Sequence, residues 1–228
     1  MLPPSVENGP SIKSYVMRGG RGTSAQQRSY DSLSGRFIIP FENTVMNYVN
    51  IFGNNNPVIA EIGFGMGGST AIIAGENPQK NYAGIEVHKP GIGRLLWEIE
   101  KRSLSNVRII EHDAVEVFMN MIPPRSLEGI HLFFPDPWPK KRHHKRRLVK
   151  RPFTGTLADR LQSGGYLYMV TDWEDYAWAA LAELSATEGM VNTCDGFSPP
   201  HAWRPRTAFE KKGLAKNHEV RELFFKKI

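Results

Sequence analysis

From residue 57 onward, short apolar runs alternate with longer amphipathic stretches, which is the pattern of a parallel β-sheet whose strands are joined by crossover helices. Strands are predicted over residues 57–62, 81–87, 107–113, 130–136 and 166–171, with an extended C-terminal stretch over 220–228. Helices are predicted over residues 24–37, 68–77, 89–103, 114–122, 153–165 and 173–184. A glycine pair at residues 164 and 165 is expected to end the helix over 153–165. The pattern therefore predicts an α/β fold.

Each of the five predicted parallel strands leads into a residue that could take part in binding or catalysis. In an open α/β sheet, ligands bind at the carboxyl ends of the strands. Five successive strand ends are therefore expected to face one crevice, and the residues placed there are Glu61, Gly63, Glu86, Asp113, Asp136 and Asp172.

The segment "EIGFGMGG" (61–68) matches the dinucleotide fingerprint G-x-G-x-x-G through Gly63, Gly65 and Gly68. The match alone is weak, because it needs only three glycines. Its context strengthens it, since the glycines follow a predicted strand, precede a predicted helix and are trailed by Glu86. A carboxylate in that place can accept hydrogen bonds from both hydroxyls of a ribose.

The positions of two further acids favour S-adenosylmethionine over a nicotinamide cofactor. Glu61 stands two residues before the first glycine, where it would face a cationic amino or sulfonium group but would repel a pyrophosphate. Asp113 is placed to accept a hydrogen bond from the exocyclic amine of adenine. The alternative for each acid is a structural role as the cap of the following helix. A nicotinamide-dependent oxidoreductase stays open as a rival function.

The net charge of +6 is concentrated in one segment. Residues 140–151 hold eight Lys or Arg and no acid, so the rest of the chain sums to 6 − 8 = −2. A clustered excess of this kind is typical of a nucleic-acid contact, although a solvated charged loop is the alternative. An RNA-binding module without catalytic activity is therefore a second rival function.

Length and composition limit the number of domains and the kinds of site that the chain can hold. Its 228 residues fit one medium domain, predicted over 26–228, and the Gly-, Ser-, Pro- and Arg-rich residues 1–25 are interpreted as a mobile basic arm. Neither an apolar run of about 18 residues nor a signal peptide is visible, so a cytoplasmic protein without membrane contact is expected. Cys194 is the single cysteine, and the adjacent His143 and His144 cannot share one ion from a regular helix or strand, so no metal is expected.

Six segments carry a resemblance to a known family: "EIGFGMGGST", "GIEVHKPGIGRLL", "HDAVEVF", "LFFPDPWPKKRHHKRR", "TDWEDYA" and "RPRTAFEKKG". Together they closely resemble the bacterial tRNA (guanine-N7-)-methyltransferases, which are class I S-adenosylmethionine-dependent enzymes. The resemblance extends from about residue 15 to the C-terminus. It implies a Rossmann-like class I methyltransferase fold with a mostly parallel seven-stranded sheet flanked by helices. It also implies methylation of guanine N7 in tRNA, at nucleotide 46 of the variable loop.

The resemblance implies roles for individual residues. The cofactor contacts are Glu61, Glu86, Asp113 and Asp136, to which the glycine fingerprint adds Gly63 and Gly65; Asp136 is also the catalytic residue. The expected substrate contacts are Lys140, Arg142, His143, His144, Lys145, Arg146, Arg147, Asp172, Thr207, Ala208, Phe209 and Glu210. Ala208 stands where the family usually has lysine, so the contact of that lysine is not carried over. The expected partner is tRNA, bound by a monomer or a homodimer.

The chemistry of guanine limits what Asp136 can do. Guanine N7 carries a lone pair and no proton, so attack on a methyl group needs no general base. Asp136 could instead accept hydrogen bonds from guanine N1 and N2 and stabilise the positive charge that develops on the ring. Pro135 and Pro137 restrict its backbone. The alternative is a helix-capping acid at a strand end. Trp138 could stack on a flipped guanine or pack on its own loop, and the sequence leaves both open.

Overall fold

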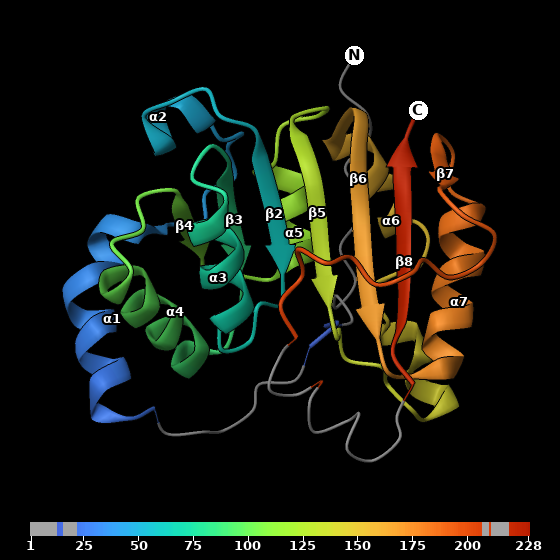
Figure 1. Ribbon diagram of the computed structural model, residues 1–228, viewed down its shortest axis with the longest axis horizontal. Helices are drawn as coiled ribbons and strands as arrows, with labels where there is room; N and C mark the ends of the chain where they lie inside the picture. The colour runs from blue at the N-terminus through green and yellow to red at the C-terminus, as the bar shows by residue number, and fades with distance from the viewer. Residues whose placement is uncertain (1–12, 16–21, 207–209, 211–218) are drawn as a thin grey trace.

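An eight-stranded sheet runs through the computed structural model, which describes residues 13–15, 22–206, 210 and 219–228 (Figure 1). Its strand order is β1-β4-β3-β2-β5-β6-β8-β7. The pairings from β1 through β6 are parallel, whereas β8 is antiparallel to both β6 and β7. The strands are β1 (Ile38–Ile39), β2 (Val58–Ile62), β3 (Asn81–Ile85), β4 (Val107–Ile110), β5 (Leu127–Phe133), β6 (Leu161–Thr171), β7 (Met190–Asn192) and β8 (Arg221–Lys227).

Helices cover both faces of the sheet (Figure 1). They are α1 (Ser24–Phe37), α2 (Tyr48–Phe52), α3 (Gly68–Glu76), α4 (Lys89–Lys101), α5 (Ala114–Asn120), α6 (Phe153–Arg160) and α7 (Glu174–Ser185), with a 3₁₀ helix η1 (Lys141–Arg146). Alternate side chains of β2 enter two different cores. Ile59 packs with residues of α1, α3 and α4, and Val58 packs with residues of α5, α6 and α7. Because both faces are covered, β2 is buried along its whole length, including its one acid, Glu61.

The chain reverses direction across the sheet between β2 and β5. It passes from β2 to β3 and β4 on one side, and then returns to add β5 on the other side of β2. The carboxyl ends of β2 and β5 therefore lie at a topological switch point, where the loops diverge and leave a crevice. This is the part of the fold that positions the site.

Most predicted elements are present, but the helix predicted over residues 153–165 ends at Arg160. Leu161 already pairs with Leu127 of β5, and the pairing shifts register before Tyr166. A Cβ on Gly165 would lie 2.9 Å from the Leu127 carbonyl oxygen, so this glycine permits close approach of two strands. The glycine pair therefore lies within strand β6 and does not end helix α6.

Two further differences concern the edges of the fold. Within the described residues the sheet has eight strands where seven were predicted, because Ile38–Ile39 adds a short parallel strand beside β4. The predicted N-terminal arm, residues 1–25, lies mostly outside the described residues, and α1 begins at Ser24 with a capping box formed by Thr23 and Gln26.

Among the helices of the described residues, all are too short or too polar to span a membrane.

Candidate functional site

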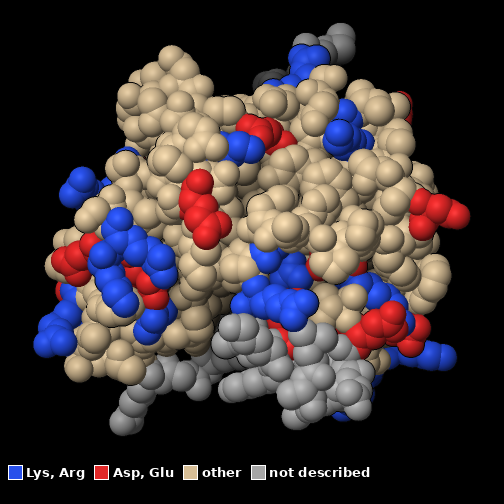
Figure 2. Space-filling model, viewed as in Figure 1, with Lys and Arg blue, Asp and Glu red and all other residues tan. Residues whose placement is uncertain are grey.

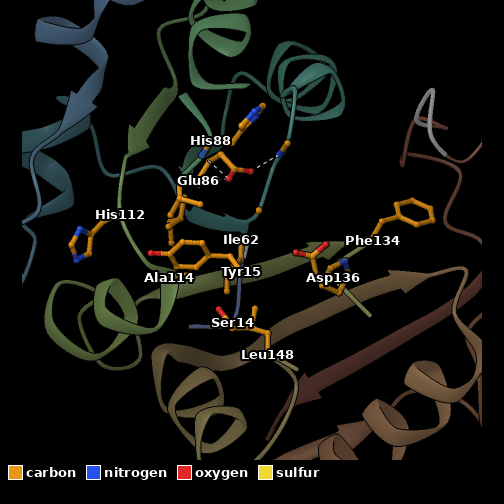
Figure 3. Close-up of a pocket in the computed structure, with 15 residues that line it drawn as sticks. Ser14, Tyr15, Ile62, Glu86, His88, His112, Ala114, Phe134, Asp136 and Leu148 are labelled. Carbon is orange, nitrogen blue, oxygen red and sulfur yellow. Dashed lines mark hydrogen bonds between the residues drawn. The ribbon is translucent and has the colours of Figure 1, made fainter. Parts of the chain in front are cut away.

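A pocket of about 250 Å³ lies at the switch point, at the carboxyl ends of β2, β3 and β5 (Figure 3). Its walls come from the loops that follow four strands and from a short N-terminal segment. The lining residues include Gly63 and Gly65 after β2, Glu86 and His88 after β3, His112 after β4, Asp136 after β5, and Ser14 and Tyr15. Four of the predicted cofactor residues, Gly63, Gly65, Glu86 and Asp136, thus share one cavity.

The glycine loop after β2 is shaped by three residues with positive φ, namely Gly63, Gly65 and Gly67. Gly68, which completed the sequence fingerprint, instead begins α3. The loop lies directly against the first turn of α4, since a Cβ on Gly91 would be 2.0 Å from the Gly65 carbonyl oxygen. Gly91 was not predicted as a site residue, because its role depends on a backbone contact made by the fold.

The Glu86 carboxylate joins this loop to the start of α4 (Figure 3). Its Oε2 accepts the Gly65 N–H at 2.9 Å, and its Oε1 accepts the N–H groups of Val87 at 2.7 Å and His88 at 3.1 Å. A carboxylate has about four acceptor positions, so roughly one is left for a ligand. Glu86 is therefore a fixed acceptor on the pocket wall, with about one acceptor position left for a ligand.

Glu61 lies within β2 and is 3% exposed, so it does not line the pocket surface. Its Oε2 has no hydrogen-bond partner among the described residues. Burial raises the pKa of Glu61 to about 7, and the negative charge of Glu86 adds to the rise. The capping alternative is wrong for Glu61, because the N-cap of α3 is Gly67 and receives no side-chain bond. A buried carboxyl oxygen without a partner is costly, and a cationic ligand group would relieve that cost.

Asp113 is the N-cap residue of α5, which is the structural role that the sequence left open as the alternative to a cofactor contact. Its carboxylate accepts the Val115 N–H at 2.9 Å, and burial raises its pKa. The carboxylate is not part of the pocket lining, but the adjacent His112 and Ala114 are. Asp113 thus fixes the segment that forms this wall.

Asp136 follows β5 and points into the pocket from the side opposite His112 (Figure 3). Asp136 is not the N-cap residue of the next helix, since η1 begins at Lys141 and its N-cap is Lys140. Two residues earlier, the Phe134 N–H donates to the Val170 carbonyl of β6 at 2.8 Å, with Phe134 at a φ of 54°. The neighbouring strand therefore holds the loop that carries Asp136.

The basic run that follows Asp136 consists of residues 140–147, and its side chains differ in exposure. Lys140, Lys141, Arg142 and Lys145 are exposed, and His143, His144 and Arg146 are partly exposed, whereas the side chain of Arg147 is only 5% exposed. Figure 2 shows Lys and Arg side chains near the carboxyl ends of β5 and β6, and a second group over α4. The exposed members of the run are therefore available to a polyanion at the rim of the pocket.

Trp138 packs on its own loop. It is 9% exposed, its Nε1–H donates to the Ser14 carbonyl at 3.1 Å, and the Arg146 guanidinium lies over its ring at 4.8 Å. Of the two interpretations left open by the sequence, the structure supports packing, because the ring is not free to stack on a flipped guanine.

The substrate contacts predicted in the C-terminal part of the chain do not lie together in the pocket. Asp172 follows β6 but does not line the pocket, and Thr207, Ala208 and Phe209 lie outside the described residues. Glu210 is 4% exposed, and both of its carboxylate oxygens accept hydrogen bonds from Arg204, at 2.7 and 2.8 Å.

Glu210 therefore belongs to a buried cluster that was not predicted. Arg204 also donates to Glu222 at 2.7 Å and to the Tyr168 hydroxyl at 3.1 Å, and the Tyr168 hydroxyl donates to Glu222. The Glu210 carboxylate is thus held inside the protein and is not presented to a ligand. The sequence gives no signal for this cluster, because its members come from separate segments.

Comparison with known proteins places these features in a family. A family model described as a putative methyltransferase matches residues 55–223. A tRNA (guanine-N(7)-)-methyltransferase of Nitrosomonas eutropha is 50% identical over 96% of this chain and 97% of its own length. The enzyme of the same name from Nitrosospira multiformis is 46% identical over 97% of this chain and 98% of its own.

Solved structures agree on the fold. The 16S rRNA methyltransferase KamB has a TM-score of 0.59 at 13% identity and covers 79% of this chain and 93% of its own. A putative methyltransferase from Streptococcus mutans, in complex with SAH, has a TM-score of 0.51 at 12% identity over 90% of this chain and 99% of its own. These likenesses show a Rossmann-like methyltransferase fold, and the sequence relatives show the family. The chain therefore belongs to the tRNA (guanine-N7-)-methyltransferase family.

Proposed function

We propose that the protein transfers the methyl group of S-adenosylmethionine to N7 of a guanine in the variable loop of tRNA. The observation that carries the proposal is the position of Asp136, which points into the switch-point pocket and stands at the head of the exposed basic run. A base presented by RNA on that run would meet a methyl donor held in the pocket beside this carboxylate. The chain's near full-length similarity to tRNA (guanine-N7)-methyltransferases supports the same assignment.

The residues around the pocket fit S-adenosylmethionine. Glu61, which is buried next to the lining residue Ile62, supplies a carboxyl oxygen that has no partner among the described residues for the cationic end of the cofactor, and Glu86 supplies an acceptor for its ribose. The wall fixed by Asp113 is assigned to the adenine side. When bound, the cofactor supplies a methyl group on a positively charged sulfur.

Methyl transfer to N7 requires no general base from the protein. The N7 lone pair forms the new bond to carbon, the sulfur–carbon bond breaks, and its electron pair stays on sulfur. No proton leaves N7, so Asp136 acts by accepting hydrogen bonds from the guanine N1 and N2 groups and by stabilising positive charge on the ring. Holding N7 in line with the methyl group supplies most of the acceleration.

The wider assignments are proposals of the same kind. Residues 26–228 are assigned to one methyltransferase domain, which the single sheet that joins β1 to β8 supports. The protein acts in the cytoplasm, as a monomer or homodimer, without a metal. Among the described residues, no three His, Cys, Asp or Glu side chains are grouped to hold a metal ion.

The exposed cations of the basic run are expected to set the salt dependence of tRNA binding. Changing Lys140, Arg142 and Lys145 to Ala together should weaken binding and reduce the slope of log K against log salt by roughly 2 to 3, because each phosphate contact contributes about 0.7 to 0.9. The measurement is tRNA binding across a salt series. A control in which the exposed Arg36, Lys101 and Lys226 are changed to Ala alters the net charge equally and should keep the slope. Equal slopes in the two triple variants would contradict the assignment.

Cofactor affinity is expected to depend on pH through Glu61. Its pKa of about 7 in the free protein falls when a cation binds beside it, so binding releases a proton and strengthens as pH rises. The apparent affinity should increase about fivefold from pH 6 to pH 7, because the protonated fraction of Glu61 falls from roughly nine-tenths to about one-half. Calorimetric titration with S-adenosylmethionine, in buffers of different ionisation enthalpy, measures both affinity and proton release. Glu61→Gln should bind more weakly and without this pH dependence; a flat wild-type profile would refute the role of Glu61.

Base selectivity tests the proposed function itself. Labelled S-adenosylmethionine is incubated with an unmodified tRNA transcript, and with a transcript whose variable-loop guanine is replaced by adenine. Methyl incorporation is expected only into the first transcript. Equal incorporation into both would overturn the proposed target.

A further inference from the structure

Arg147 differs from the other cations of the basic run in its surroundings. Its guanidinium forms an ion pair with Asp175 of α7, donates to His144 Nε2 at 3.1 Å, and lies over the Tyr176 ring at 4.9 Å. Its Nε–H donates to the Pro137 carbonyl at 2.9 Å. Its Nε and Nη2 groups are thus bonded to acceptors of the same chain and the side chain is only 5% exposed, so it is not presented to a phosphate as its exposed neighbours are.

The carbonyl that Arg147 holds belongs to the residue directly after Asp136. On the other side of Asp136, the Phe134 N–H is bonded to the Val170 carbonyl of β6. The proline rings at 135 and 137 restrict the backbone between these two points. Asp136 is therefore carried by a short segment fixed to β6 at one end and, through Arg147, to α7 at the other.

The contacts of Arg147 suit a guanidinium and not an ammonium. Its planar fork reaches three acceptors that come from the Asp136 loop, from η1 and from α7, while its flat face lies over Tyr176. A lysine is a point charge on a flexible stem and cannot hold all of these groups in one geometry. Asp175, whose side chain is 63% exposed, completes the link from the solvent side.

We propose that Arg147 is a positioning residue for methyl transfer, which fixes the Pro137 carbonyl and thereby the place of Asp136, and that it does not contact RNA phosphate. This proposal rests on the proposed function of Asp136. Displacing a positioned group by about 1 Å can cost on the order of a hundredfold in rate. Loss of Arg147 should therefore appear in kcat, whereas loss of a phosphate contact appears in tRNA affinity and its salt dependence.

The first test compares Arg147→Met and Arg147→Lys with the exposed neighbour Lys145→Ala. Both Arg147 variants are expected to lower kcat for tRNA methylation by about ten- to a hundredfold. Their affinity for S-adenosylhomocysteine and the salt slope of tRNA binding should match the wild type. Lys145→Ala should instead raise KM and reduce the slope by about 0.7 to 0.9. A reduced slope with unchanged kcat in the Arg147 variants would overturn the proposal.

Asp175→Asn gives a milder variant that keeps Arg147 in place, and it should lower kcat in the same direction by a smaller factor. The second test repeats Arg147→Met in an Asp136→Asn background. If Arg147 acts through Asp136, the two losses overlap and the double variant is little slower than Asp136→Asn alone. Losses that multiply would contradict positioning. If the wild type itself methylates no guanine N7, the proposed function fails, and that outcome is separate from any difference between variants.

Discussion

Asp136→Ala is expected to lower kcat for tRNA methylation by about a hundred- to a thousandfold, the usual cost of removing one group that stabilises a developing charge. The side chain points into the pocket from a loop fixed to β6 and α7, so its loss removes the acceptor that orients guanine. Affinity for S-adenosylhomocysteine should change by less than about tenfold, because Glu61, Glu86 and the glycine loop remain. Single-turnover kinetics and calorimetric titration measure the two effects separately.

Asp136→Asn distinguishes holding a base from removing a proton. The amide keeps one acceptor oxygen, so activity should be reduced but measurable, and the acidic limb of the rate profile should not shift. Complete loss of activity, with an intact fold and normal cofactor binding, would argue that the carboxylate has a further chemical role.

Gly91→Ala is expected to weaken cofactor binding by at least about a hundredfold, since the glycine loop must be displaced and positioning is lost. The new Cβ would lie 2.0 Å from the Gly65 carbonyl oxygen, and backbone atoms cannot give way as a flexible side chain can. Moving the loop away from α4 also breaks the bond between the Gly65 N–H and Glu86. Thermal shift and calorimetric titration with S-adenosylhomocysteine measure the loss.

Gly155→Ala is the matched control for Gly91→Ala. Gly155 lies within α6, and a Cβ there meets no atom within 4 Å apart from its chain neighbours and the backbone of its own helix. This change should leave cofactor affinity unchanged and raise the free energy of unfolding by about 0.5 to 1 kcal/mol. Wild-type affinity in Gly91→Ala would show that the close packing of the glycine loop on α4 is not needed for the pocket.

The sequence predicted well where local pattern decides the structure. The start of α1 at Ser24 and the mainly apolar β2 follow from residue types within a few positions. The gathering of Gly63, Glu86 and Asp136 follows from the rule that parallel strand ends share one edge.

What could not be predicted depends on contacts between distant segments. Arg147 has the same residue type as Arg146, and only the approach of α7 buries it. Glu210 has the charge of a ligand-binding acid, but Arg204, which also donates to Glu222, holds it inside the protein. The glycine pair after α6 resembles a helix end, and only the pairing with β5 shows that Gly165 serves a strand.

The most direct measurement maps the methylated position. Unmodified tRNA is incubated with the protein and labelled S-adenosylmethionine, and the chain is then cleaved chemically at N7-methylguanosine. A single new cleavage at a guanine of the variable loop, carrying all of the label, is the expected result. Label on adenine, or label that does not coincide with the cleavage site, would contradict the assignment of guanine N7 as the acceptor.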